Sequence, residues 1–375
     1  MSCAINSIPA VISCYRFEDI ASEVKEQLRF TMEGNETGEC IMRCQDGNSL
    51  TAIDLSAEMT RYLINVALQH MPDGSTVDGA VVAIPAHFSV AQKQATLEAA
   101  QNGGVNIVHL LQEPVAAALA YGVEGGTDGE TILVFDWGGG TFDVSIIQAF
   151  EGIMEILGTD GDQFLGGDDI DELVLQWVLQ SYTAALLDSV DTEGLNDACR
   201  RAKEELTRSI STLIRYGDEE LCVLDRGMLI EIMGPLWHKL ALVLDRIGKH
   251  LFVEWSMDPY QAISCLKSSS DHLDRHTAEE APNSDADPWV APPRKVTKVV
   301  LVGQITRLPM VRKYVQLVTG IQPCDNVDPG EAVALGAATQ AGILHGSIGS
   351  VELMDGSYSI DLHDRTTGFL TNWQP

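Results

Sequence analysis

The sequence has few basic residues, no long apolar run and no leader-like N-terminus. Its 375 residues contain 24 Lys and Arg against 54 Asp and Glu, which gives a formal net charge of −30 at pH 7. A surface with this charge repels nucleic acid and anionic membranes, so the sequence argues against a role in binding either one. Without an apolar run of about 18 residues or a basic segment followed by an apolar one, neither a membrane span nor a secretory signal is predicted.

Paired cysteine motifs are also missing. Eight cysteines are scattered along the chain without a CxxC pair, and the one close pair, Cys40 and Cys44, has no second pair to complete a zinc site. Reduced, buried cysteines are the expected state, and the cytoplasm is the predicted location.

A run of three glycines, Gly138–Gly140, stands between two apolar, β-prone segments, Thr131–Phe135 and Thr141–Ile147. This pattern predicts two strands joined by a tight hairpin. Glycine lets backbone N–H groups approach a ligand closely, and several such groups pointing one way bind an anion such as phosphate. Asp136 and Asp143 flank the turn, where they would hold Mg²⁺ through its waters, and Thr141 adds a hydroxyl. A glycine hairpin with two solvated acids fits these residues equally well.

Before this hairpin, the chain alternates between strand and helix patterns, which predicts an α/β fold. The expected strands are 39–43, 49–53, 77–84 and 105–111, and the expected helices are 55–70, one from the capping box at Ser89 and Gln92 to Gly103, and one that Glu113 and Pro114 open.

After the hairpin, a second glycine and aspartate cluster at 160–169 precedes a helix-rich region. The predicted helices are 170–187, 195–209, 226–254, 308–318 and 329–344; strands are expected at 154–158, 211–215, 221–223 and 299–302; and a disordered loop is expected at 267–295.

Five separated segments resemble the nucleotide-binding domain of the 70-kDa heat-shock chaperone family, in the same order. They are 112–122, 136–145, 165–171, 300–307 and 331–338. The resemblance implies the actin-like ATPase fold, with two lobes around a nucleotide cleft. It places an incomplete first lobe at 1–135, a second lobe at 136–345 with an accessory helical subdomain at about 170–265, and a linker-like segment with a C-terminal stub at 346–375.

The resemblance also assigns site residues. It makes Glu113, Asp136, Thr141 and Asp143 catalytic, with Asp136 and Asp143 holding Mg²⁺ through water. Nucleotide binding falls to Gly138, Gly139, Gly140, Thr141, Gly166, Gly167, Lys203, Thr207, Gly303 and Arg307. Within this set, Gly303 would approach the α-phosphate, Arg307 would stack on adenine and Lys203 would contact the nucleoside. Glu113 also fits an ordinary helix-start acid, and Lys203 a solvated helix charge.

Several positions depart from the family pattern. The N-terminal phosphate hairpin has no counterpart, and Ala10 stands where a catalytic lysine is expected. The missing strands would leave residues 81–84 with an unpaired edge. In the nucleoside pocket, Arg200, Glu204 and Gly330 replace an expected Glu, Arg and Asp, and Gln304 replaces a glycine. These changes make efficient hydrolysis doubtful.

The sequence therefore supports two functions of different class. The first is the nucleotide-binding module of a heat-shock-type chaperone active in stress response and protein folding, which binds ATP or ADP with Mg²⁺. The second is a catalytically silent interaction protein of the same fold, and a sugar or acetate kinase is a weaker third. Co-chaperones or other chaperones are the expected partners, while client-peptide binding is not expected because few residues follow Asp355.

Overall fold

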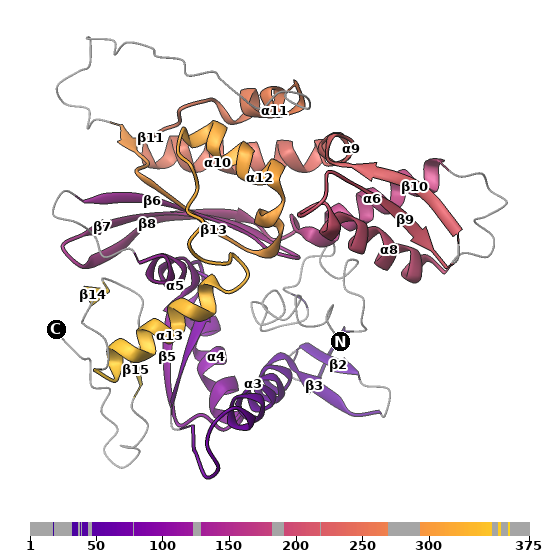
Figure 1. The fold of residues 1–375 in the computed structure, drawn as a ribbon. Coiled ribbons are helices and arrows are strands. Elements are labelled where there is room, and N and C mark those ends of the chain that lie inside the picture. The colour runs from indigo at the N-terminus through magenta and orange to yellow at the C-terminus, as the bar shows by residue number, and fades with distance from the viewer. Residues whose placement is uncertain are drawn as a thin grey trace. The chain divides into compact units, whose positions relative to one another are not determined.

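The computed structural model describes Glu18 and residues 32–36, 38, 40–43, 47–77, 79–122, 129–181, 191–217, 219–268, 293–346, 352–353 and 359–360. These residues form a mixed α/β structure that divides into two compact units (Figure 1). Unit 1 comprises the described parts of 1–124, 152–154 and 332–375, and unit 2 those of 125–151 and 155–331. Each unit is described by itself.

Unit 1 contains two small sheets and four helices among its described residues. One sheet has the order β1-β2-β3 and the other the order β15-β5-β4. The elements are β1 (Met32–Gly34), β2 (Cys40–Arg43), β3 (Ser49–Thr51), α3 (Ala52–Gln69), β4 (Gly79–Ile84), α4 (Val90–Asn102), β5 (Ile107–Gln112), α5 (Glu113–Ala120), α13 (Ala332–Leu344), β14 (Glu352–Leu353) and β15 (Ser359–Ile360).

Local sequence signals set the starts of these helices. The capping box predicted at Ser89 and Gln92 is present before α4, with both reciprocal hydrogen bonds formed, and Thr51 and Asp54 make another before α3. Pro114 lies in the first turn of α5, where its missing N–H costs nothing. The starts of α4 and α5 are therefore confirmed, whereas α3 begins at Ala52, three residues before the expected start, because Thr51 caps it.

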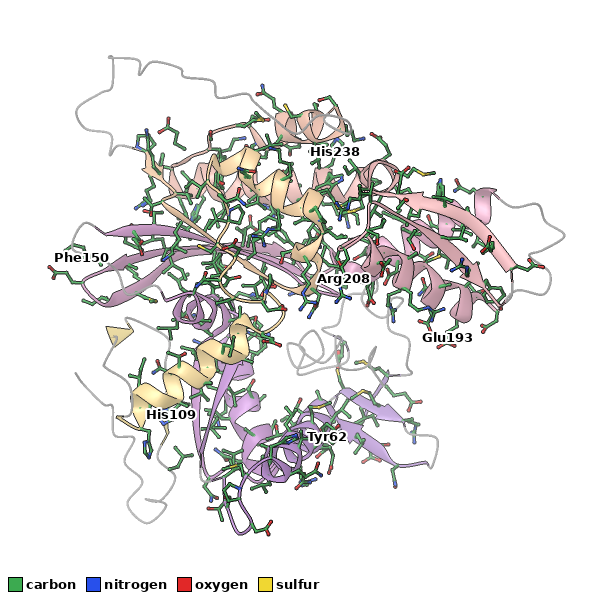
Figure 2. The ribbon with its side chains drawn as sticks, in the orientation of Figure 1. Tyr62, His109, Phe150, Glu193, Arg208 and His238 are labelled. Carbon is green, nitrogen blue, oxygen red and sulfur yellow. The ribbon has the colours of Figure 1, made fainter. Side chains whose placement is uncertain are left out.

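Strand β4 lies at the end of its sheet. It pairs in parallel with β5 and with no other described strand, and residues 80–83 are partly exposed. On the far side of β5, Ser359 of β15 pairs with His109 (labelled in Figure 2). His109 is half-buried, and burial lowers its pKa.

Unit 2 is built on the strands β13, β6, β7 and β8, with helices stacked on one face of the sheet (Figure 1). Its elements are β6 (Glu130–Trp137), β7 (Phe142–Phe150), β8 (Ile153–Asp162), α6 (Gly167–Ser181), α8 (Thr192–Glu205), β9 (Ser211–Tyr216), β10 (Glu219–Asp225), α9 (Arg226–Ile232), α10 (Gly234–Leu251), β11 (Val253–Glu254), α11 (Pro259–Ser268), β12 (Arg294–Lys295), β13 (Lys298–Val302), the 3₁₀ helix η2 (Gln304–Arg307) and α12 (Pro309–Thr319). The first three residues of β8 belong to unit 1.

A continuous apolar core fixes the position of the strand ends in unit 2. Its centre is a chain of aromatic rings in which Trp137 contacts Trp237 and Trp237 contacts Tyr314, with centroid distances of 5.9 and 5.3 Å. All three side chains are fully buried. Because Trp137 ends β6, this packing anchors the turn that follows it.

Two expectations about the helical region are corrected. The single helix expected at 226–254 is two helices, α9 and α10, bent by 67° at their junction. The break falls at Gly234-Pro235, because proline cannot continue a helix and fits the first turn of the next one. The ends of the loop expected at 267–295 are ordered as parts of α11 and β12, and its residues 269–292 lie outside the described residues.

The unit boundaries also differ from the expected lobes. The whole of β6 belongs to unit 2 because it pairs with β7 and β13, so the division does not fall at residue 135. Helix α13 belongs to unit 1 because it packs on α5, where Gly336 lies against the backbone of Ala116.

No single helix in the described ranges is long and apolar enough to cross a membrane, and only the bent pair α9 and α10 meets that test when taken together.

Candidate functional site

The glycine turn, residues 138–141, lies at the end of the hairpin that the sequence predicted. Strands β6 and β7 are antiparallel, with Asp136 opposite Asp143 and Trp137 opposite Phe142. Since side chains alternate along a strand, Trp137 and Phe142 enter the core, while the two aspartates share the opposite face and are partly exposed. The Gly138 N–H donates to the Thr141 carbonyl at 3.0 Å and closes the turn.

The start of α6 holds two carbonyl groups of this turn. The Gly167 N–H donates to the Gly138 carbonyl at 3.0 Å, and the Asp168 N–H donates to the Gly139 carbonyl at 2.8 Å. In a trans peptide the N–H points opposite to the C=O, so the N–H groups of Gly139 and Gly140 both point away from α6. Neither group donates to another described residue. Two adjacent N–H groups aimed the same way form a binding place for an anion.

Close backbone packing explains the second pair of glycines. A Cβ on Gly166 would lie 2.5 Å from the Gly139 carbonyl carbon, and one on Gly167 would lie 2.8 Å from Ile305 Cδ1. The contact at Gly166 is with backbone atoms that cannot turn aside, so the turn and the start of α6 can meet only if residue 166 is glycine, whereas a Cβ on Gly167 would require the Ile305 side chain to move. The Gly166 N–H donates to Asp169 Oδ2 at 2.7 Å, which fixes the approach from the α6 side.

The two facing aspartates form an electrostatically unfavourable pair. Burial, together with the charge of Asp143, raises the pKa of Asp136 to about 7. A cation beside the pair would remove this penalty. Within the described ranges, no group of three or more His, Cys, Asp or Glu side chains could hold a metal ion directly. Two carboxylates suit a hydrated cation such as Mg²⁺, because this ion takes oxygen ligands and keeps several of its waters.

Gly303 brings a second backbone segment to the same place. Strand β13 runs parallel to β6 with Val302 beside Asp136, and Gly303 follows with a φ of 85°. A Cβ at this position would overlap the Trp137 carbonyl and lie 2.9 Å from Asp136 Oδ1. Only glycine combines this left-handed conformation with such a close approach.

Lys203 is buried in unit 2 and is not a solvated helix charge, which corrects that alternative. Helix α8, which carries it, lies between the labelled Glu193 and Arg208 (Figure 2). The Nζ of Lys203 lies 2.7 Å from Asp171 Oδ1 and donates to the Gly167 carbonyl at 2.9 Å. Arg200 Nε donates to Asp171 Oδ2 at 3.0 Å. The ion pairs with Lys203 and Arg200 lower the pKa of Asp171, but burial outweighs them and raises it.

Two predicted residues have no interaction that tests their roles. The hydroxyl of Thr207 donates to the Glu204 carbonyl at 2.7 Å in the turn after α8. Glu113 is the first residue of α5 and belongs to unit 1, where it is also the helix-start acid that the sequence suggested. A contact of either residue with a nucleotide or with the attacking water stays a prediction.

Comparison with known proteins shows which family the chain belongs to. The family model described as "Hsp70 protein" matches residues 10–235 and 285–368, which is most of the chain. The chain belongs to the Hsp70 family. The resemblance read from the five sequence segments is thereby confirmed. The Hsp70 model leaves residues 236–284 unmatched.

Several curated relatives of this Hsp70 chain are chaperones. It is 35% identical over 341 residues to the chaperone protein dnaK1 of Nostoc sp., covering 91% of this chain and 46% of that protein. It is 33% identical to the chaperone protein dnaK of Thalassiosira pseudonana, covering 93% and 53%. It is 33% identical to the heat shock 70 kDa protein 7, chloroplastic, of Arabidopsis thaliana, covering 91% and 44%. The chain thus spans about half the length of the curated relatives it matches.

The Hsp70 chain brings most predicted residues together within unit 2. Gly166 and Gly167 contact the glycine turn, and Gly303 contacts Trp137 and Asp136 at the end of β6. Lys203 reaches the same place through the Gly167 carbonyl. Sequence reasoning missed the supporting acids Asp169, Asp171 and Asp328. Asp328 could have been found, because Asp-Pro-Gly is a turn signal in which the first side chain accepts a backbone N–H.

Proposed function

We propose that this chain is the nucleotide-binding module of an Hsp70-type chaperone, with ATP or ADP and Mg²⁺ bound at the glycine turn of unit 2. The observation that carries the proposal is the direction of the turn peptides. Their carbonyls are taken up by the N-terminus of α6, and the N–H groups of Gly139 and Gly140 are left facing the opposite way. The β- and γ-phosphates are the chemical groups that suit such donors.

The remaining residues suit the other parts of a nucleotide. Asp136 and Asp143 would orient Mg²⁺ through its waters, and the bound ion would neutralise phosphate charge. Gly303 leaves room for the α-phosphate, and Arg307, at the far end of η2, would stack on the base. Phosphoryl transfer needs mainly positioning and charge neutralisation, so Thr141 and Glu113 would act by orienting the attacking water.

The proposal also covers the fold of the chain and its partners. Units 1 and 2 would be the two lobes of an actin-like ATPase fold, and co-chaperones or other chaperones would be the partners. The cytoplasmic location stays a prediction, since one relative is named chloroplastic.

Thermal unfolding with MgADP tests nucleotide binding. A ligand that binds only the folded state at about 100 times its Kd adds about 2.7 kcal/mol of stability, so MgADP should raise the Tm by several degrees. Gly140→Ala should remove most of this rise, because the added methyl stands in open space where a phosphate would approach.

The same variant separates ligand loss from fold loss. A Cβ on Gly140 meets no atom within 4 Å, so the Tm without nucleotide should stay within about 2 °C of the wild-type value. Gly234→Ala, at the start of α10, is the matched control and should keep the full MgADP response. An unchanged Tm of the wild-type protein at millimolar MgADP would refute the proposal.

One observation favours the alternative of a catalytically silent interaction protein. The amine of Lys203 is committed to Asp171 and to the Gly167 carbonyl, with its side chain only 6% exposed. A lysine held in this way has less freedom to contact a nucleoside. Single-turnover hydrolysis of ATP decides between the two functions: turnover that Asp136→Asn abolishes supports the ATPase, while no turnover in the wild-type protein supports the silent form.

A further inference from the structure

A short segment, residues 328–330, contacts two polar side chains of η2, Gln304 and Arg307. Both carboxylate oxygens of Asp328 accept hydrogen bonds from Arg307 Nη2, at 2.5 and 2.6 Å. Asp328 Oδ1 also accepts from the Gly330 N–H at 2.8 Å, and the Gly303 N–H donates to the Pro329 carbonyl at 3.0 Å. The segment is therefore tied to η2 at its start and at its end.

Gln304 and Gly330 have complementary shapes. A Cβ on Gly330 would overlap Gln304 Nε2 and lie 2.9 Å from its Cδ, so the carboxamide of Gln304 occupies the space that any other residue at 330 would fill. These are two of the positions that depart from the family pattern. An acid at position 330 would therefore require the Gln304 carboxamide to move.

The position of η2 relative to the glycine turn indicates which part of a bound ligand Arg307 would face. The residue before η2, Gly303, lies against the Trp137 carbonyl and Asp136, at the phosphate end of the site. A 3₁₀ helix rises about 2 Å per residue, so Arg307 lies about 8 Å further along, toward the nucleoside end of a ligand held at the turn. Its side chain is 36% exposed.

We infer that Asp328 is a positioning residue for the nucleoside end of the site, which holds the Arg307 guanidinium at Nη2 and leaves its planar face open to a purine ring. This inference rests on the proposed function and names the part of the ligand that the segment 328–330 serves. Position 330 carries glycine where the family pattern has an acid, and Asp328 places a carboxylate two residues earlier in the chain. Its pKa is lowered mainly by the hydrogen bond from Arg307, so the carboxylate is charged at neutral pH. Both carboxylate oxygens share one guanidinium nitrogen, Nη2, so the charged carboxylate fixes that end of the Arg307 side chain.

Calorimetric titration of the full chain with ADP and with pyrophosphate, both in the presence of Mg²⁺, tests the inference. Asp328→Asn should raise the Kd for ADP by roughly three- to tenfold, the range expected for a partly exposed, charge-assisted ion pair. The Kd for pyrophosphate should change less than about twofold, because that ligand has no nucleoside. Asp325→Asn, an exposed acid on the same loop, is the matched control and should change neither value.

A double variant separates positioning from a general loss of structure. With Arg307→Ala already present, Asp328→Asn should raise the Kd for ADP by less than about a further twofold, since there is no longer a guanidinium to position. Equal weakening of both ligands, an unchanged ADP affinity, or full additivity with Arg307→Ala would overturn the inference. If the wild-type chain binds neither ligand, the proposed function fails as well; if it binds both and Asp328→Asn changes nothing, only the inference fails.

Discussion

At the scale of single residues, the site is a balance between acids that repel and glycines that allow contact. Asp136 and Asp143 face each other across the hairpin, and in the absence of a cation this pair destabilises the folded protein. The glycines at 166 and 303 permit backbone approaches that no side chain would allow. The aspartate pair costs stability in the protein without ligand, which is a usual sign of a functional site.

Asp136→Asn should therefore stabilise the protein without ligand, and more so at pH 8 than at pH 5. The folded-state pKa, about 7, lies above the unfolded value of 3.8, so the folded state keeps a proton that the unfolded state releases. The free energy of unfolding falls as the pH rises through 7. At about 1.4 kcal/mol per pKa unit, the gain at pH 8 is at most about 4 kcal/mol and that at pH 5 is less than half as large.

Urea unfolding of the wild-type protein and the variant at the two pH values measures this difference. Asp325→Asn removes an exposed acid and should give no pH-dependent gain. A stabilisation by Asp136→Asn that is equal at pH 5 and pH 8 would contradict the raised pKa.

Gly166→Ala should be far more damaging than Gly140→Ala. The new methyl at 166 would lie 2.5 Å from the Gly139 carbonyl carbon, which is backbone and cannot turn aside, whereas the methyl at 140 meets open space. We expect Gly166→Ala to cost about 2–4 kcal/mol, as other overpacked sites do. Chemical denaturation of both variants tests the contrast, and equal stability would show that the turn does not lie against α6.

At the scale of elements, the sequence predicts best what is decided locally. The hairpin of β6 and β7 follows from two β-prone segments and three glycines, and the start of α4 follows from Ser89 and Gln92. The break between α9 and α10 was missed because the apolar pattern continues across Gly234-Pro235. Burial of Lys203 depends on Asp171, 32 positions earlier in the chain, and the role of Asp328 depends on Arg307, so neither could be read from a local pattern.

The contact between α13 and α5 in unit 1 gives an element-scale prediction. A Cβ on Gly336 would overlap the Ala116 carbonyl and lie 2.8 Å from Ala116 Cα. In an isolated helix, glycine to alanine stabilises by about 1 kcal/mol, but here Gly336→Ala should destabilise by a few kcal/mol because the helices must separate. Thermal unfolding measures the sign directly. Leu335→Ala, at a more exposed position beside it, should have a small effect, and a stabilising Gly336→Ala would mean that the two helices do not touch there.

At the scale of the whole molecule, the net charge of −30 acts on stability. Like charges in a compact chain repel one another, and salt screens that repulsion with a Debye length of about 30 Å at 0.01 M and about 10 Å at 0.1 M. The Tm without nucleotide should therefore rise over this range of salt. A comparison of NaCl with choline chloride separates screening from specific cation binding at Asp136 and Asp143. A Tm that falls with both salts would contradict the expectation.

The hydrogen bonds between α6 and the glycine turn have an electrical consequence. Each peptide of the turn continues the row of aligned dipoles in the helix, because the Gly167 N–H polarises the Gly138 carbonyl and thereby the Gly139 N–H beyond it. The positive pole of α6 is in effect displaced outward by one peptide, to the bend between the strands. An anion at the bend would therefore be stabilised by the dipole of α6, although that helix begins only at Gly167. A change that bends or unwinds the first turn of α6 would weaken the field at the bend without touching the bend itself.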